Sequence, residues 1–103
     1  MIRKDDRTEE QKTTHVYGVV ALDRFMSGWG RAQDGTSRCG WACETLEDQQ
    51  RLYEWVRARD EMHDVKAVDL RTYRPPKRGT AHFHLYVAEA THPAFKGRTV
   101  DTQ

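Results

Sequence analysis

The sequence lacks both a long hydrophobic run and a large excess of one charge. Its longest apolar run is the seven residues VYGVVAL, far short of the roughly 18 that suggest a membrane span. Seventeen Lys and Arg face sixteen Asp and Glu, a net charge of +1, whereas proteins that bind duplex DNA usually carry a larger basic excess. The amino terminus has no apolar segment of the secretory kind. We therefore expect a cytoplasmic protein that uses neither a membrane nor duplex DNA as its main partner.

Motifs of familiar catalytic chemistry are also missing. The chain has no phosphate loop, no HExxH and no CxxC. None of His15, His82 and His84 begins the His-x-Ser/Thr motif that a tandem-histidine phosphoesterase would need. No motif in the chain identifies a family. These absences favour a binding module over an enzyme, and no cofactor is expected.

Cysteine is scarce, with only Cys39 and Cys43 in the chain. Both stand beside Trp41 in an alternating stretch, where a cysteine usually serves as a small hydrophobic side chain. In a straight strand their Cα atoms would lie about 13 Å apart, beyond the reach of a disulfide. We expect two reduced thiols and no nucleophile at either position.

What the chain does contain suits one small folded domain. Its 103 residues include 37% hydrophobic and 32% charged residues, with ten aromatic side chains, too many for a disordered chain. Residues 1–13 carry charges that cancel and little to bury, so they are expected to form a mobile or poorly anchored tail. We place the domain at 14–91 and a second tail at 92–103.

Alternation of apolar residues predicts strands, and one helical pattern separates them. The expected strands are 14–23, 28–33, 37–43, 65–71 and 80–89, and the expected helix spans 45–62, where Thr45 and Asp48 resemble a capping box. Gly35 in QDGT favours a hairpin turn. The predicted fold class is α+β: an antiparallel sheet of four or five strands in β-β-β-α-β-β order, with one helix packed on one face.

The stretch GTAHFHLYVAE, residues 79–89, carries the most distinctive pattern. Phe83 and Leu85 alternate with His82, His84 and Tyr86. If the apolar pair faces the helix, the two imidazoles and the phenol face away from it. That second face is expected to be uncovered, because a single helix covers only one face of a sheet.

Further residues extend this expected face into a binding surface. The surface is predicted to comprise His15, Tyr17, Trp29, Arg31, His82, His84 and Tyr86, with contacts to phosphates or an acidic partner from Arg71, Arg74, Lys77 and Arg78 in the proline-rich loop. A weaker alternative is a metal site made by His15, His82 and His84, because histidines two apart on a strand can converge on one ion.

Three functions remain open from the sequence. The leading hypothesis is a non-enzymatic protein-binding module, with an uncovered sheet face that can also pair with a second copy. In size and style the chain is similar to small accessory proteins of plasmids and phages, including inhibitors of host defence that dock on a protein complex. The alternatives are a single-stranded RNA-binding protein and a small metal-dependent enzyme that uses the His-x-His strand.

Overall fold

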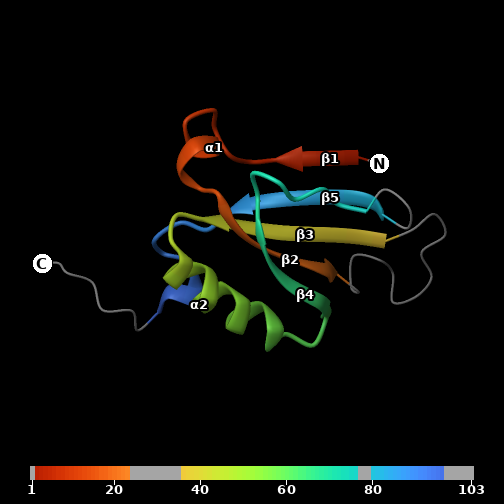
Figure 1. Cartoon of the computed structure of the whole chain (residues 1–103). Coiled ribbons are helices and arrows are strands. Elements are labelled where there is room, and N and C mark those ends of the chain that lie inside the picture. Colours follow the sequence, from red (N-terminus) through yellow and green to blue (C-terminus); the bar gives the residue numbers. More distant parts are fainter. Residues whose placement is uncertain (1, 24–35, 77–79, 97–103) are drawn as a thin grey trace, which may run out of the picture.

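A computed structural model describes residues 2–23, 36–76 and 80–96 of the chain. Its strands are β1 (Ile2–Asp5), β2 (Tyr17–Asp23), β3 (Thr36–Cys43), β4 (Met62–Asp69) and β5 (Thr80–Val87), and its helices are α1 (Gln11–Thr14), α2 (Leu46–Arg57) and the 3₁₀ turn η1 (Pro93–Phe95). Figure 1 shows one sheet with α2 packed on one side of it. None of the helices in these ranges is long and apolar enough to cross a membrane.

The sheet is mixed, which corrects the prediction of an antiparallel sheet while the α+β class is confirmed. Strand order is β1-β5-β3-β2-β4. β5 pairs in parallel with both β1 and β3, whereas β2 is antiparallel to β3 and β4. Parallel neighbours need long connections, and the chain supplies them between β3 and β5 through α2, β4 and the segment after it. The prediction from the sequence included only antiparallel strand pairs.

The first residues of the chain belong to the sheet, contrary to the expectation of a tail over 1–13. Ile2–Asp5 form the edge strand β1 beside β5. The following turn is held by Arg7, whose guanidinium pairs with Asp5 at 2.9 Å and donates to the carbonyl of His15 at 2.9 Å. The strand consists of one apolar and three charged residues, so hydrophobic patterning alone could not reveal it.

Helix α2 begins as the sequence predicts and ends earlier. Thr45 is its N-cap, and its Oγ1 accepts a hydrogen bond from the Asp48 amide at 3.0 Å. The helix ends at Arg57 because β4 already begins at Met62, inside the predicted helical range. Toward the sheet, α2 buries Leu52 and Val56 completely.

The sheet has an apolar cluster on each face. The cluster under α2 contains Val19, Ala21, Cys39, Trp41, Cys43, Leu52, Val56, Ala88 and Phe95. The opposite cluster contains Val20, Ala42, Phe83 and Leu85, and Leu70 and Tyr73 from the segment after β4 pack against it. The expectation of a bare second face is therefore wrong, because the connection from β4 to β5 supplies its cover.

Gly40 lies where two side chains of this second cluster meet. A Cβ at Gly40 would lie 3.0 Å from Cγ1 of Val20 and 3.1 Å from Cδ1 of Leu85. A glycine in the interior of a strand usually marks such a close approach. Gly40 therefore has a structural role.

The segment after β5 also packs on the domain. Phe95 of η1 is buried in the cluster under α2, and Nδ1 of His92 accepts a hydrogen bond from the Ala94 amide at 3.0 Å. The predicted boundary at residue 91 therefore falls before a packed element. The predicted strand 28–33 and the turn at Gly35 lie outside the described residues.

Candidate functional site

The distinctive histidine strand, β5, has the opposite orientation to the predicted one. Tyr86 stacks on Trp41 with ring centroids 5.8 Å apart, and Trp41 meets Trp55 of α2 edge-on at 5.9 Å. Phe83 points to the other face, where its ring lies 6.1 Å from that of Tyr73. His84 and Tyr86 therefore share the face that carries the helix. The predicted orientation assumed that the sheet has one apolar cluster, under the helix. Because the sheet has a second apolar cluster on its other face, Phe83 and Leu85 can be buried there.

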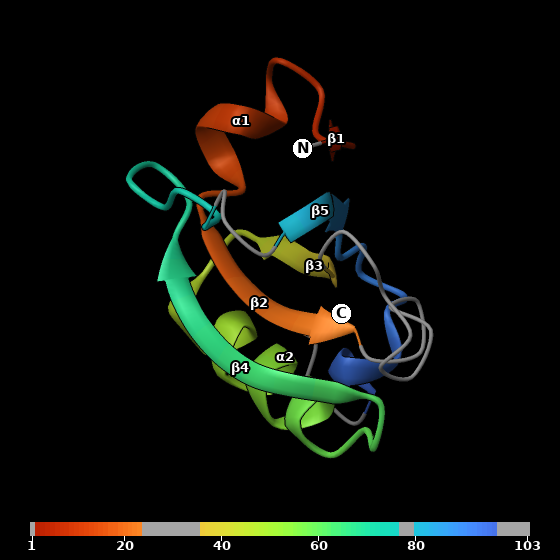
Figure 2. The same cartoon turned by 90° about the vertical axis from the view of Figure 1, so that its right-hand side faces the viewer.

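Helix α2 nevertheless leaves this part of the face open. It packs on β4 and β2 and less extensively on β3, while β5 lies farther along the sheet. Figure 2 shows α2 beneath β2, with β4 passing in front of it, and away from β5. Tyr86 is 39% exposed as a result, although it stands on the same face as the buried Trp41.

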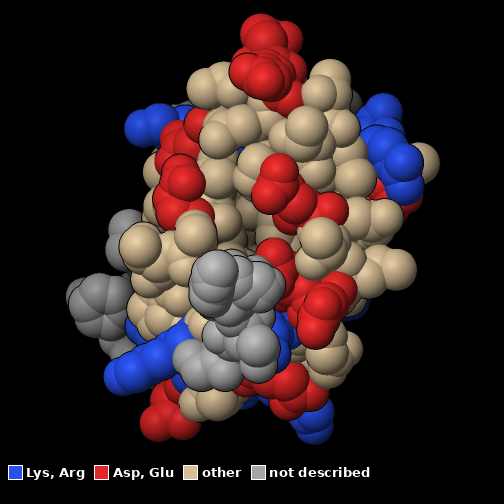
Figure 3. Space-filling model, turned by 90° about the vertical axis from the view of Figure 1, so that its left-hand side faces the viewer, with Lys and Arg blue, Asp and Glu red and all other residues tan. Residues whose placement is uncertain are grey.

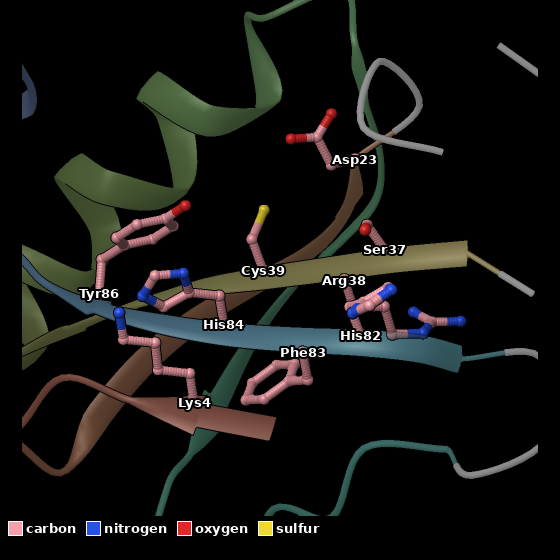
Figure 4. Close-up of a pocket in the computed structure, with 9 residues that line it drawn as sticks. All are labelled: Lys4, Asp23, Ser37, Arg38, Cys39, His82, Phe83, His84 and Tyr86. Atoms are coloured by element: carbon pink, nitrogen blue, oxygen red, sulfur yellow. The ribbon is translucent and has the colours of Figure 1, made fainter. Parts of the chain in front are cut away.

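A groove lies in this open region, and we call it the β5 groove. It encloses about 350 Å³ and is lined by Lys4, Asp23, Ser37, Arg38, Cys39, His82, Phe83, His84 and Tyr86 (Figure 4). This volume is at the lower end of the range for small-ligand sites. The groove brings together residues from four strands that are widely separated in the sequence.

The strand registers explain how these residues meet. Asp23, Ser37 and His82 form one row across β2, β3 and β5. Cys39, His84 and Lys4 form the next row, across β3, β5 and β1. In the third row Trp41 lies beside Tyr86. Residues directly opposite one another on paired strands share a face, so the three rows line one continuous strip.

Some polar groups of the groove already have partners. Nε2 of His84 lies 2.9 Å from Oδ2 of Asp6, and its ring stacks on Tyr86 with centroids 4.0 Å apart. Burial raises the pKa of Tyr86 above its ordinary value, so its phenol stays protonated at neutral pH. Lys4 and His82 are exposed and make no ion pair or hydrogen bond with the residues that the structure describes.

Of the predicted binding surface, the groove gathers His82, His84 and Tyr86 but not His15 or Tyr17. Tyr17 pairs with Cys43 on the far side of β3 and packs against the cluster under α2. His15 precedes β2, and its Nδ1 lies 2.9 Å from Oγ1 of Thr14. The predicted platform required the strand after residue 14 to pair with β5, but β3 separates them.

Arg71 and Arg74 of the basic loop do not line the groove either. Leu70 and Tyr73 anchor this segment on the opposite face of the sheet. Arg71 forms an ion pair with Asp69 at 2.8 Å, and Arg74 donates to the carbonyl of Tyr73 at 3.0 Å. A single nucleic-acid strand lying in the groove would therefore not meet these arginines.

Four predicted residues cannot be placed on either face. Trp29, Arg31, Lys77 and Arg78 lie outside the described residues. Their assignment to a binding surface stays a prediction.

A neighbouring imidazole already occupies one face of the Tyr86 ring and so reduces the room for a stacked nucleobase. One side of the phenol ring carries His84 at an interplanar angle of 24°, and Trp41 stacks at 28°. The Tyr86 side chain is 39% exposed, so a partner can still reach its hydroxyl and part of its ring. Single-stranded nucleic-acid binders instead use exposed ring faces.

The carboxyl ends of three parallel strands carry acidic residues. Asp6 follows β1, Glu44 follows β3 and Glu89 comes shortly after β5, and all three are exposed. Parallel strands end at the same edge of a sheet, and Figure 3 views this end and shows acidic side chains spread over it.

The thiol in the groove is not activated. Burial, together with the nearby Asp23 carboxylate, raises the pKa of Cys39 to about 12, and its Sγ lies 3.9 Å from Sδ of Met62. Burial likewise raises the pKa of Cys43 to about 12. Both cysteines are free, as predicted. No group of three or more His, Cys, Asp or Glu side chains suited to a metal ion occurs within the described residues, so His15, His82 and His84 do not converge.

Sequence reasoning missed Lys4, Asp6, Asp23 and Ser37. Asp23 is the last residue of one predicted strand and Ser37 the first of another, and only the register of β2 on β3 brings them together. Lys4 and Asp6 fall in the expected tail, and no pattern there signals a strand. Cys39 was expected in the core, and it both packs there and lines the groove.

The fold and site thus define a small α+β domain with a five-stranded mixed sheet and a polar groove beside its main helix. Comparison with protein-family models, curated proteins and solved structures finds no match to this chain.

Proposed function

We propose that the protein is a non-enzymatic protein-binding module whose partner docks on the β5 groove. The observation that carries the proposal is the position of the groove at the edge of the helix-bearing face. There Lys4 and His82 are exposed and have no polar partner among the described residues, and Tyr86 is 39% exposed. Rigid aromatic side chains with a polar tip are typical anchors of protein interfaces.

The chemistry of the groove supports binding over catalysis. Cys39 is the only cysteine in it, and its raised pKa keeps the thiol protonated at neutral pH. His84 is held by Asp6 and by the Tyr86 ring. An inhibitor or accessory protein of a mobile element, acting on a protein complex, is the narrower form of the same proposal. It uses the same groove.

Site-specific photo-crosslinking tests the proposal. A benzoylphenylalanine placed at His82, which is exposed and lines the groove, is expected to capture a partner protein in cells that make the chain. The matched control is the same group at Lys66 on the edge strand β4, which is also exposed and does not line the groove. Excess unlabelled wild-type protein should abolish the crosslink at position 82.

The product identifies the partner by mass. A crosslink at position 82 to a second copy of the chain would make the partner the chain itself, a homodimer through the groove. Equal crosslinking at positions 82 and 66, or none at 82, would contradict docking on the groove.

A further inference from the structure

We infer that the partner enters the β5 groove with a short acidic segment, whose carboxylates meet Lys4, His82 and the hydroxyl of Tyr86. This inference rests on the proposed function and adds the chemistry of the partner. It depends on the difference between the polar groups of the groove that already have partners within the chain and those that remain available to a ligand.

The groups left for a ligand are mainly hydrogen-bond donors. The ammonium of Lys4 has three N–H donors and no acceptor, and the protonated phenol of Tyr86 can donate one more. Neither group has a hydrogen bond or ion pair with the described residues. His82, equally without a described polar partner, adds a ring N–H in either neutral tautomer.

The carboxylates near the groove are already committed. Asp6 is paired with His84, and Asp23 takes part in interactions within the chain. A ligand that supplies acceptors therefore completes the groove, whereas a basic ligand would place its charge beside Lys4. Charge-assisted hydrogen bonds between an ammonium and carboxylates are shorter and stronger than neutral ones.

The registers place the three donors at successive levels along β5, two of them on β5 itself and Lys4 on the neighbouring strand β1. Lys4 stands beside His84 on β1, His82 lies two residues before it on β5, and Tyr86 lies two residues after it. Successive residues of the same parity on a strand are about 6.6–7 Å apart. An extended peptide lying along β5 has the same spacing, so its alternate acidic side chains can each lie level with one of the three donors.

Peptide chemistry fits better than nucleic-acid chemistry, the other source of repeated negative charge. The His84 ring covers one face of the Tyr86 ring, and Arg71 and Arg74 of the basic loop do not line the groove. A short acidic segment needs neither a stacking face nor an extended basic track.

Binding of a defined probe tests this inference. A short fluorescein-labelled peptide of alternating glutamate and serine is titrated with the full chain and followed by fluorescence anisotropy. The glutamate peptide is expected to bind at least about tenfold more tightly than its glutamine counterpart, a difference of about 1.4 kcal/mol. The K4E and H82E variants should each weaken binding by about fivefold or more.

The control variant is K66E, which makes the same charge reversal on β4, outside the groove. It should change the affinity by less than about twofold, because charges far from the site are screened by salt. Circular dichroism checks that each variant folds. Because K4E could loosen β1, H82E at an exposed position keeps the test valid if K4E fails to fold.

Each outcome has one meaning. Equal affinity for the glutamate and glutamine peptides, or equal loss in K66E and H82E, would overturn the inference, as would tighter binding of a labelled oligouridine than of the acidic peptide. If the acidic peptide fails while crosslinking at position 82 still captures a protein, the inference is wrong and the proposed function stands. If the crosslink at position 82 fails as well, both are wrong.

Discussion

Replacing Leu85 by alanine is expected to lower the free energy of unfolding by about 2–5 kcal/mol, the usual cost of removing a buried leucine side chain. Leu85 is 1% exposed and belongs to the cluster on the face opposite α2. The matched control is Leu46→Ala at the start of α2, where the leucine is 65% exposed and the change should stay within about 0.5 kcal/mol. Urea denaturation followed by tryptophan fluorescence gives both values.

A double-mutant cycle tells which face Leu85 occupies. Val20 approaches Leu85 above Gly40, so Val20→Ala and Leu85→Ala should interact by about 0.5–3 kcal/mol. Val56 of α2 lies in the cluster on the other face, and Val56→Ala should add to Leu85→Ala within about 0.5 kcal/mol. Strong coupling to Val56 and none to Val20 would place Leu85 on the helix-bearing face and contradict the structure.

Both thiols of the folded protein are expected to react with iodoacetamide about 1,000-fold more slowly than an ordinary cysteine at pH 8. A pKa raised from 9.0 to about 12 lowers the thiolate fraction by roughly that factor, and the thiolate is the reacting species. The rate should keep rising with pH well above 9, because the thiols of the folded protein titrate only near pH 12. Mass spectrometry after timed quenching follows each cysteine.

The unfolded protein is the control for this reaction. In concentrated urea Cys39 and Cys43 should both be alkylated at ordinary rates, since burial is the main cause of their raised pKa. Rapid alkylation of Cys39 in the folded protein near pH 7 would reveal an activated thiolate in the groove. That result would favour a catalytic role over a binding role.

Local signals in the sequence predicted the elements better than their arrangement. The residues that form the Thr45 cap and the apolar side of α2 lie close together in the sequence. The same holds for the strands that contain Val20, Trp41 and Leu85. Strand β1 had no such signal, because three of its four residues are charged. Its place in the sheet depends on pairing with residues about 80 positions later.

The candidate site could likewise be predicted only in part from the sequence. His82, His84 and Tyr86 are recognisable as an unusual set because they alternate along one strand. Which face they occupy depends on Leu70 and Tyr73, which cover the second cluster and so allow Phe83 and Leu85 to turn away from α2. Alternation gives the relative parity of residues on a strand, but only tertiary packing decides which parity faces the helix.

The site, the proposed function and the partner chemistry all depend on one claim, that β5 presents Tyr86 to the helix-bearing face. Nuclear Overhauser contacts between aromatic protons test it most directly. The ring of Tyr86 should give contacts to the indole of Trp41, and the ring of Phe83 should give contacts to Tyr73. Contacts from Tyr86 to Tyr73, together with contacts from Phe83 to Trp41, would show that the two faces of β5 are exchanged and would contradict the account.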